Sequence, residues 1–85
     1  MEGVTNNTVV LSVGDKVYLG FGKGTIYYAG MPSEKTYSIV QRIREFPYQG
    51  LAWNLFYPIG QNRIRIGGIN IVVDNVTPEE IRLRI

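Results

Sequence analysis

The sequence predicts an all-β domain, and three observations lead to that prediction. Ten glycines are spread through the 85 residues and separate short apolar runs. β-Branched residues and tyrosines fill those runs, which is typical of strands. Turn signals recur every roughly 8–12 residues and helical periodicity is nearly absent. We therefore expect one domain over residues 1–85, a small β-barrel of roughly five to eight short strands.

Alternation of apolar and polar residues, bounded by turn residues, places the individual strands. The expected strands are Thr8–Val13, Lys16–Leu19, Gly24–Ala29, Thr36–Glu45, Ala52–Ile59, Arg63–Ile66, Ile69–Val73 and Ile81–Ile85. The clearest pair is "RIRIGGINIVV", in which Ile64 and Ile66 share a face. Gly67 and Gly68 can then supply the positive φ angles of a two-residue hairpin turn.

The stretch "LGFGKGTIYY" raises the question of a phosphate-binding loop. Such a loop needs the spacing G-x-x-x-x-G-K-[ST], with a strand before it and a helix after it. The glycines around Lys23 lie at Gly20, Gly22 and Gly24, which does not match that spacing. The following "TIYYAG" is β-branched and aromatic and cannot start a helix. The glycines therefore predict a tight connection between two antiparallel strands.

The surrounding segment, "VGDKVYLGFGKGTIYYAG" at residues 13–30, resembles the start of Tudor- and KOW-type SH3-like barrels. It looks most like the Tudor-like module at the C-terminus of some superfamily 1 repair helicases and like CarD-type RNA-polymerase-binding domains. The matching positions are Gly14, Asp15, Val17, Phe21, Gly22, Gly24, Thr25 and Ile26. The resemblance implies an SH3-like barrel, and it implies nucleic acid, RNA polymerase or another protein surface as partner. Small barrels host many activities, so it bears on the fold more than on function.

Arginines occur at two-residue spacing in three predicted strands, which places each pair on one face of its strand. Isoleucine or leucine takes the other face. Three adjacent strands of this kind would form a guanidinium surface suited to phosphate. The candidate nucleic-acid-binding residues are Arg42, Arg44, Arg63, Arg65, Arg82 and Arg84, with Lys23 at a loop tip. The alternative is that these arginines only keep one strand face solvated, pairing with nearby carboxylates.

Aromatic residues concentrate in "FPYQGLAWNLFYPIG", at residues 46–60, and are too many for a half-buried strand. We expect part of this segment to meet another chain. The candidate interface residues are Phe46, Tyr48, Trp53, Phe56 and Tyr57. A small core and an Ile-rich final strand at a sheet edge add to the expectation of a homo-oligomer. A protein-interaction or assembly role, as in viral shells or the transcription machinery, therefore competes with nucleic-acid binding.

The C-terminal "NVTPEEIRLRI" carries two signals. Thr77, Pro78 and Glu80 match the start of a capped helix. Ile81, Leu83 and Ile85 instead alternate with arginines, as in a strand. A short helical turn at Pro78–Glu80 that leads into a closing strand satisfies both.

Catalysis is not expected, because the chain has no cysteine and no histidine and its carboxylates show no paired spacing. The same absence excludes disulfides and cysteine or histidine metal sites, and no cofactor is predicted. No apolar run approaches the about 20 residues that span a bilayer, and the N-terminus does not read as a signal peptide. We therefore expect a soluble cytoplasmic protein without a membrane partner.

Overall fold

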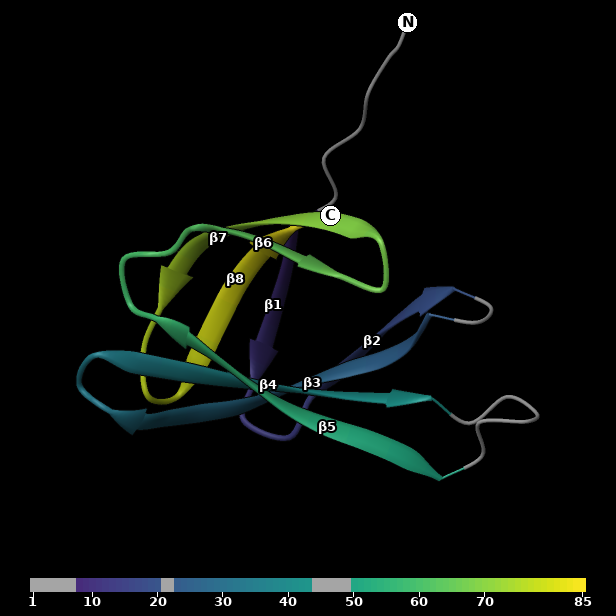
Figure 1. Ribbon diagram of the computed structural model, residues 1–85. Helices are drawn as coiled ribbons and strands as arrows, with labels where there is room; N and C mark the ends of the chain where they lie inside the picture. Colours follow the sequence, from purple (N-terminus) through teal and green to yellow (C-terminus); the bar gives the residue numbers. More distant parts are fainter. Residues whose placement is uncertain (1–7, 21–22, 44–49) are drawn as a thin grey trace, which may run out of the picture.

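Two antiparallel sheets stack to form the domain. The computed structural model describes residues 8–20, 23–43 and 50–85. Its strands are β1 (Thr8–Ser12), β2 (Lys16–Gly20), β3 (Gly24–Ser33), β4 (Thr36–Ile43), β5 (Leu51–Pro58), β6 (Arg63–Ile66), β7 (Ile69–Val76) and β8 (Glu80–Arg84). One four-stranded sheet has the order β1-β8-β7-β6 and the other the order β2-β3-β4-β5. Figure 1 shows the strands of the first sheet running across those of the second.

All eight predicted strands are present, with differences at their ends. β3 continues beyond the expected end at Ala29, because a bulge at Gly30 (φ 92°) keeps the strand paired with β4 as far as Ser33. β7 likewise extends beyond Val73 through a second bulge. The expected end of the fourth strand, at Glu45, lies outside the described residues.

The two sheets are not closed into a barrel, so the expected barrel closure is wrong. The chain passes from one sheet to the other at a corner. There the Val13 amide donates to the carbonyl of Glu79 (3.1 Å), in the turn before β8, and the Gly14 amide donates to the carbonyl of Tyr28 (2.9 Å), on β3 of the second sheet. Gly14 has a φ of 92°, which lets the backbone turn there. The strands on either side of this corner belong to different sheets, and among the described strands each sheet ends in two edge strands, β1 and β6 in one and β2 and β5 in the other.

The hydrophobic core lies between the sheets, where alternating residues of both inner faces meet. Its buried members are Leu11, Ile26, Tyr28, Tyr37, Ile39, Ile64, Ile66, Ile71, Val73, Ile81 and Leu83. The predicted two-residue turn between β6 and β7 is confirmed, with φ values of 59° and 81° at Gly67 and Gly68. This turn packs against Lys23 and Gln41, which belong to the other half of the molecule.

Two core tyrosines fix loops through their hydroxyl groups. The Tyr37 hydroxyl donates to the carbonyl oxygen of Gln61 (2.6 Å), and the Tyr28 hydroxyl donates to that of Thr77 (2.5 Å). Tyr37 also packs against Tyr57, with ring centroids 5.4 Å apart. Burial, followed by the nearby Tyr57 and Tyr28, raises the pKa of Tyr37 to about 12. Both tyrosine rings thus lie in the hydrophobic core while their hydroxyl groups are hydrogen-bonded, as buried polar groups usually are.

The expected helical turn before the last strand is wrong. Only Thr77, Pro78 and Glu79 separate β7 from β8, and they form a tight turn. The Thr77 amide donates to the Glu80 carbonyl (2.8 Å), while the Thr77 hydroxyl oxygen accepts from the amides of Glu79 (3.3 Å) and Glu80 (3.0 Å). Thr77, which the sequence predicts as a helix cap, thus stabilises a turn. No helix forms, because β8 begins at Glu80, only four residues after the end of β7.

Replacing Thr77 with alanine is expected to cost about 1 kcal/mol, because two turn amides lose their acceptor. Urea denaturation of the wild type and the variant measures this difference. Thr77→Ser keeps the hydroxyl and should retain most of the stability. An alanine variant as stable as the serine variant would show that the hydroxyl bonds do not hold the turn.

Candidate nucleic-acid interface

Four of the predicted arginines lie on the outer face of the β1-β8-β7-β6 sheet. Arg63 and Arg65 come from β6, and Arg82 and Arg84 come from β8. The apolar residues that alternate with them are buried in the core, so each strand turns its arginines outward. The face assignment made from the alternation is therefore confirmed for these two pairs.

β7 separates the two arginine pairs. Val72 lies opposite Arg63 on one side and opposite Arg84 on the other, so these two arginines share a row across the sheet. Two strand spacings separate them, which corresponds to about 10 Å between backbones. Arg65 lies opposite Asn70, and Arg82 lies opposite Asn75. The result is two basic strips with an uncharged strip between them, which we call the arginine face (Arg63, Arg65, Arg82 and Arg84).

One of the four guanidinium groups is paired. Arg84 Nε donates to both carboxylate oxygens of Asp74, at 2.8 and 3.1 Å. Asp74 and Asn75 form the β7 bulge opposite Arg82, and the bulge brings the carboxylate to the outer face. Both side chains of the pair are partly exposed, so the pair adds little stability. Within the described parts of the chain, no ion pair joins Arg63, Arg65 or Arg82 to a carboxylate.

The remaining predicted basic residues lie elsewhere. Arg42 is on β4, opposite Thr25 and Ala52, and so belongs to the other sheet. Arg44 lies outside the described residues. The backbone of Lys23 lies beside Gly67, close to the end of β6 that carries Arg65, and its carbonyl accepts from Gln41 (3.0 Å). The fold thus brings four of the seven predicted residues together, places Lys23 near them, and separates Arg42.

The predicted interface residues of the aromatic segment, residues 46–60, also have different surroundings in the structure. Trp53 and Phe56 are 43% and 60% exposed, and strand alternation puts them on opposite faces of β5. Tyr57 is half-buried and packs on Tyr37, so it contributes to the core. Part of its side chain remains accessible, and its predicted role at an interface stays a prediction. Phe46 and Tyr48 lie outside the described residues.

Sequence reasoning missed a second aromatic surface, on the outer face of the β2-β3-β4-β5 sheet. Tyr27 lies opposite Lys16 on β2 and opposite Val40 on β4. A shallow depression beside it is lined by Tyr27, Val40, Arg42 and Ala52, among others. The alternation of "KVYLG" and "TIYYA" carries the signal for this face, since each strand sends one tyrosine outward.

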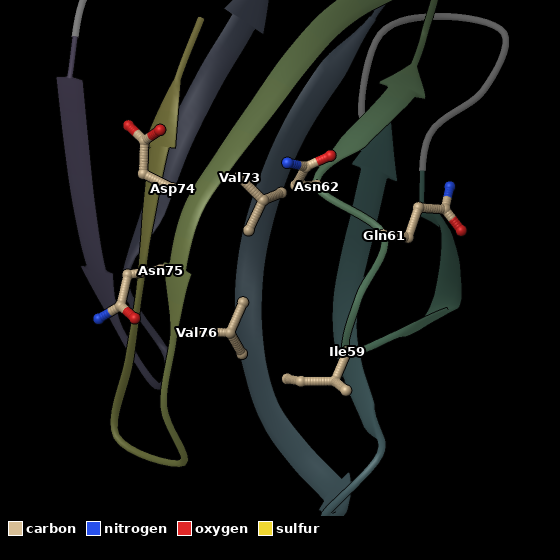
Figure 2. Close-up of a pocket in the computed structure, with 7 residues that line it drawn as sticks. All are labelled: Ile59, Gln61, Asn62, Val73, Asp74, Asn75 and Val76. Carbon is tan, nitrogen blue, oxygen red and sulfur yellow. The ribbon is translucent and has the colours of Figure 1, made fainter.

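A second pocket lies between the β5–β6 connection and β7. Figure 2 shows Asp74 and Asn75 on one side of it and Ile59 and Gln61 on the other. Of its seven lining residues, Asp74 is the one with an ionisable side chain, and the carboxylate is bound by Arg84. The pocket therefore presents no free acid or base to a ligand.

Two features that would indicate a class of function, a metal-binding cluster and a membrane-spanning helix, are not seen in the described residues. Across residues 8–20, 23–43 and 50–85, no cluster of acidic side chains is arranged to hold a metal ion. Nor does this part of the chain contain a helix long and apolar enough to cross a lipid bilayer. No protein-family model matches the chain, and comparison with curated proteins and with solved structures finds no significant match. A proposal about function must therefore be based on the exposed side chains of the two sheets.

Proposed function

We propose that the chain is a non-catalytic binding module whose arginine face contacts the phosphate backbone of a nucleic acid. The observation that supports this most is the gathering of Arg63, Arg65 and Arg82 on one exposed sheet face without a carboxylate partner among the described residues. Guanidinium groups bind phosphate oxygens through paired N–H donors. An unpaired cluster on a rigid sheet is suited to that task.

The composition of the same face supports a proposal about which part of a nucleic acid it would contact. The other outward residues of its strands are small, polar or aliphatic, such as Val10, Asn70 and Val72. No aromatic ring lies on the described part of this face, so bases have nothing to stack on there. We therefore infer contact with phosphates, with little preference for sequence.

A kinship with Tudor- and KOW-type SH3-like modules is part of this proposal. Local features of the β2–β3 hairpin and its entry turn support it. The Asp15 carboxylate accepts from the Ser12 amide (3.0 Å), as the glycine-aspartate turn of the resemblance leads one to expect. Val17, Leu19 and Ile26 pack in or against the core. The kinship concerns this hairpin, since the sheets are not joined into a barrel.

Replacing Arg63 and Arg65 together with alanine is expected to weaken binding to single- and double-stranded DNA and RNA of every sequence. Each lost phosphate contact should flatten the log–log dependence of affinity on salt by roughly 0.7–0.9, so the double variant should lose about 1.4–1.8 of the slope. Fluorescence anisotropy at several salt concentrations measures both effects.

A matched control is Lys16→Ala with Lys35→Ala, which removes the same charge from exposed positions away from the arginine face. Equal weakening by both double variants would reduce the effect to net charge and refute the site. Wild-type protein that binds no nucleic acid even at low salt would refute the function.

The second candidate function is protein interaction or assembly, which the exposure of Trp53 and Phe56 on β5 favours. Large apolar side chains that stay exposed on an edge strand are typical of contact surfaces.

A further inference from the structure

β5 is an edge strand without the features that normally protect an edge. It is the last strand of the β2-β3-β4-β5 sheet, it is eight residues long, and its sequence LAWNLFYP has no charged residue. Leu51, Trp53 and Phe56 are 42%, 43% and 60% exposed. Natural edges are usually short, charged or bulged. The edge strands β1 and β2 have five residues each, and β6 has four residues and carries Arg63 and Arg65.

Hydrogen-bond alternation shows which main-chain groups of β5 face away from β4 and have no partner among the described strands. The amide of Ile59 donates to the carbonyl of Lys35 (2.7 Å), and the β4–β5 register runs from there without a shift. Antiparallel pairs alternate between bonded and non-bonded positions. Trp53 and Leu55 therefore direct their main-chain groups toward β4. The N–H and C=O groups of Ala52, Asn54 and Phe56 point to the open edge.

These free groups are complementary to themselves. A two-fold axis perpendicular to the sheet, beside the open edge at Asn54, sets Asn54 opposite Asn54 of a second copy and Ala52 opposite Phe56 of that copy. About six main-chain hydrogen bonds then form, and each free donor meets a free acceptor. A register centred on Leu55 would set Ala52 opposite Pro58, which has no N–H to donate.

Side chains fit the same register. Phe56, the most exposed of the large apolar side chains of β5, lies against the smallest side chain of the strand, Ala52. On the inner face, Trp53 meets Leu55 of the second copy, and cross-strand pairs of this kind stabilise sheets. Because β5 has no charged residue, it has no side chain to form an ion pair with a charged partner. Two copies of β5 can also pair without charge repulsion.

We propose that two copies of the chain pair antiparallel along β5, about a two-fold axis at Asn54, so that their β2-β3-β4-β5 sheets become one continuous sheet. This pairing names the partner of the exposed aromatic residues, and it does not depend on nucleic-acid binding by the arginine face. It also replaces the expectation that the final strand supplies the edge, since β8 lies inside its sheet between β1 and β7.

The chain has no cysteine, so a single introduced cysteine reports on the register. Asn54→Cys places two thiols across the axis, where the Cα atoms of a bonded pair are about 5.5 Å apart, within the range of a disulfide. We expect a covalent dimer under mild oxidation at micromolar protein. Val10→Cys, an exposed position on the edge strand β1, is the control and should remain mostly monomeric. Equal cross-linking of both variants, or of neither, would overturn the register.

The unmodified chain supplies an independent measurement. Sedimentation should give twice the 9.6 kDa mass of the monomer. The single tryptophan, Trp53, should shift its fluorescence to shorter wavelength as the concentration rises and the dimer forms. Ala52→Lys with Phe56→Lys should abolish both changes while circular dichroism still reports a folded β protein. Wild-type protein that sediments at 9.6 kDa across the micromolar range would overturn the proposal.

Discussion

Replacing Gly24 with alanine is expected to destabilise the domain by about 2–5 kcal/mol, as the sum of a left-handed backbone angle and a steric clash. Gly24 is buried at the start of β3 and has a φ of 80°. A Cβ atom there would lie 2.2 Å from the carbonyl oxygen of Arg42 and 2.9 Å from Cγ1 of Ile43. Because the first of these is a backbone atom, β3 and β4 would have to separate.

Gly14 provides a matched control for this prediction. Its φ is 92°, close to that of Gly24, but a Cβ atom there would meet nothing within 4 Å. Gly14→Ala should therefore cost only the about 1–2 kcal/mol of the left-handed conformation. Urea denaturation of both variants isolates the clash as the difference between them. Similar losses for the two variants would show that β4 does not approach Gly24 as described.

Raising the pH from about 10 to about 12 is expected to remove about 2–3 kcal/mol of stability through Tyr37. Burial raises the pKa of Tyr37 in the folded protein to about 12, while the unfolded chain keeps the ordinary value of 10.0. Between these values the unfolded chain loses the proton and the folded protein retains it. The contribution is thus complete below pH 10 and disappears as the pH rises through the folded pKa. Burial raises the pKa of Tyr28 and Tyr57 as well, which acts in the same direction.

Comparison with Tyr37→Phe isolates the loss of stability that is due to Tyr37. Lysines and other groups that titrate in this pH range are present in both proteins, so their contributions cancel. At neutral pH the variant should be less stable by about 1–2 kcal/mol, because the Gln61 carbonyl loses its hydrogen bond. As the pH rises above 10, the wild type should lose more stability than the variant, and the difference between them should shrink. Parallel pH profiles, measured by urea denaturation, would contradict the assignment of the raised pKa to Tyr37.

The strands and their faces could be predicted from the sequence because they depend on neighbouring residues. Period-two alternation put Ile64 and Ile66 inside and Arg63 and Arg65 outside, and the glycine pair at the hairpin fixed its turn. These are local consequences of the pleated backbone.

Strand order could not be predicted, because alternation gives the face of a residue and not its neighbour across the sheet. Arg42 shows the same spacing as the other arginines yet lies in the other sheet. The final strand looked like an edge because it comes last, whereas β1 pairs along its outer side. Tyr57 and Phe56 are adjacent and both aromatic, and only the packing of Tyr37 against one of them separates core from surface.

The pairing of β1 with β8 has a consequence for the order in which the strands can assemble. Thr8 lies opposite Arg84, so the first strand has its partner at the far end of the sequence. β2, β3, β4 and β5 pair with their neighbours in the chain, so their sheet can assemble from contacts between nearby strands. β1 has no strand to join until Glu80–Arg84 has been made, and Leu11 stays exposed to water until then. Because contacts between distant residues form slowly, the closing of β1 onto β8 should limit the folding rate.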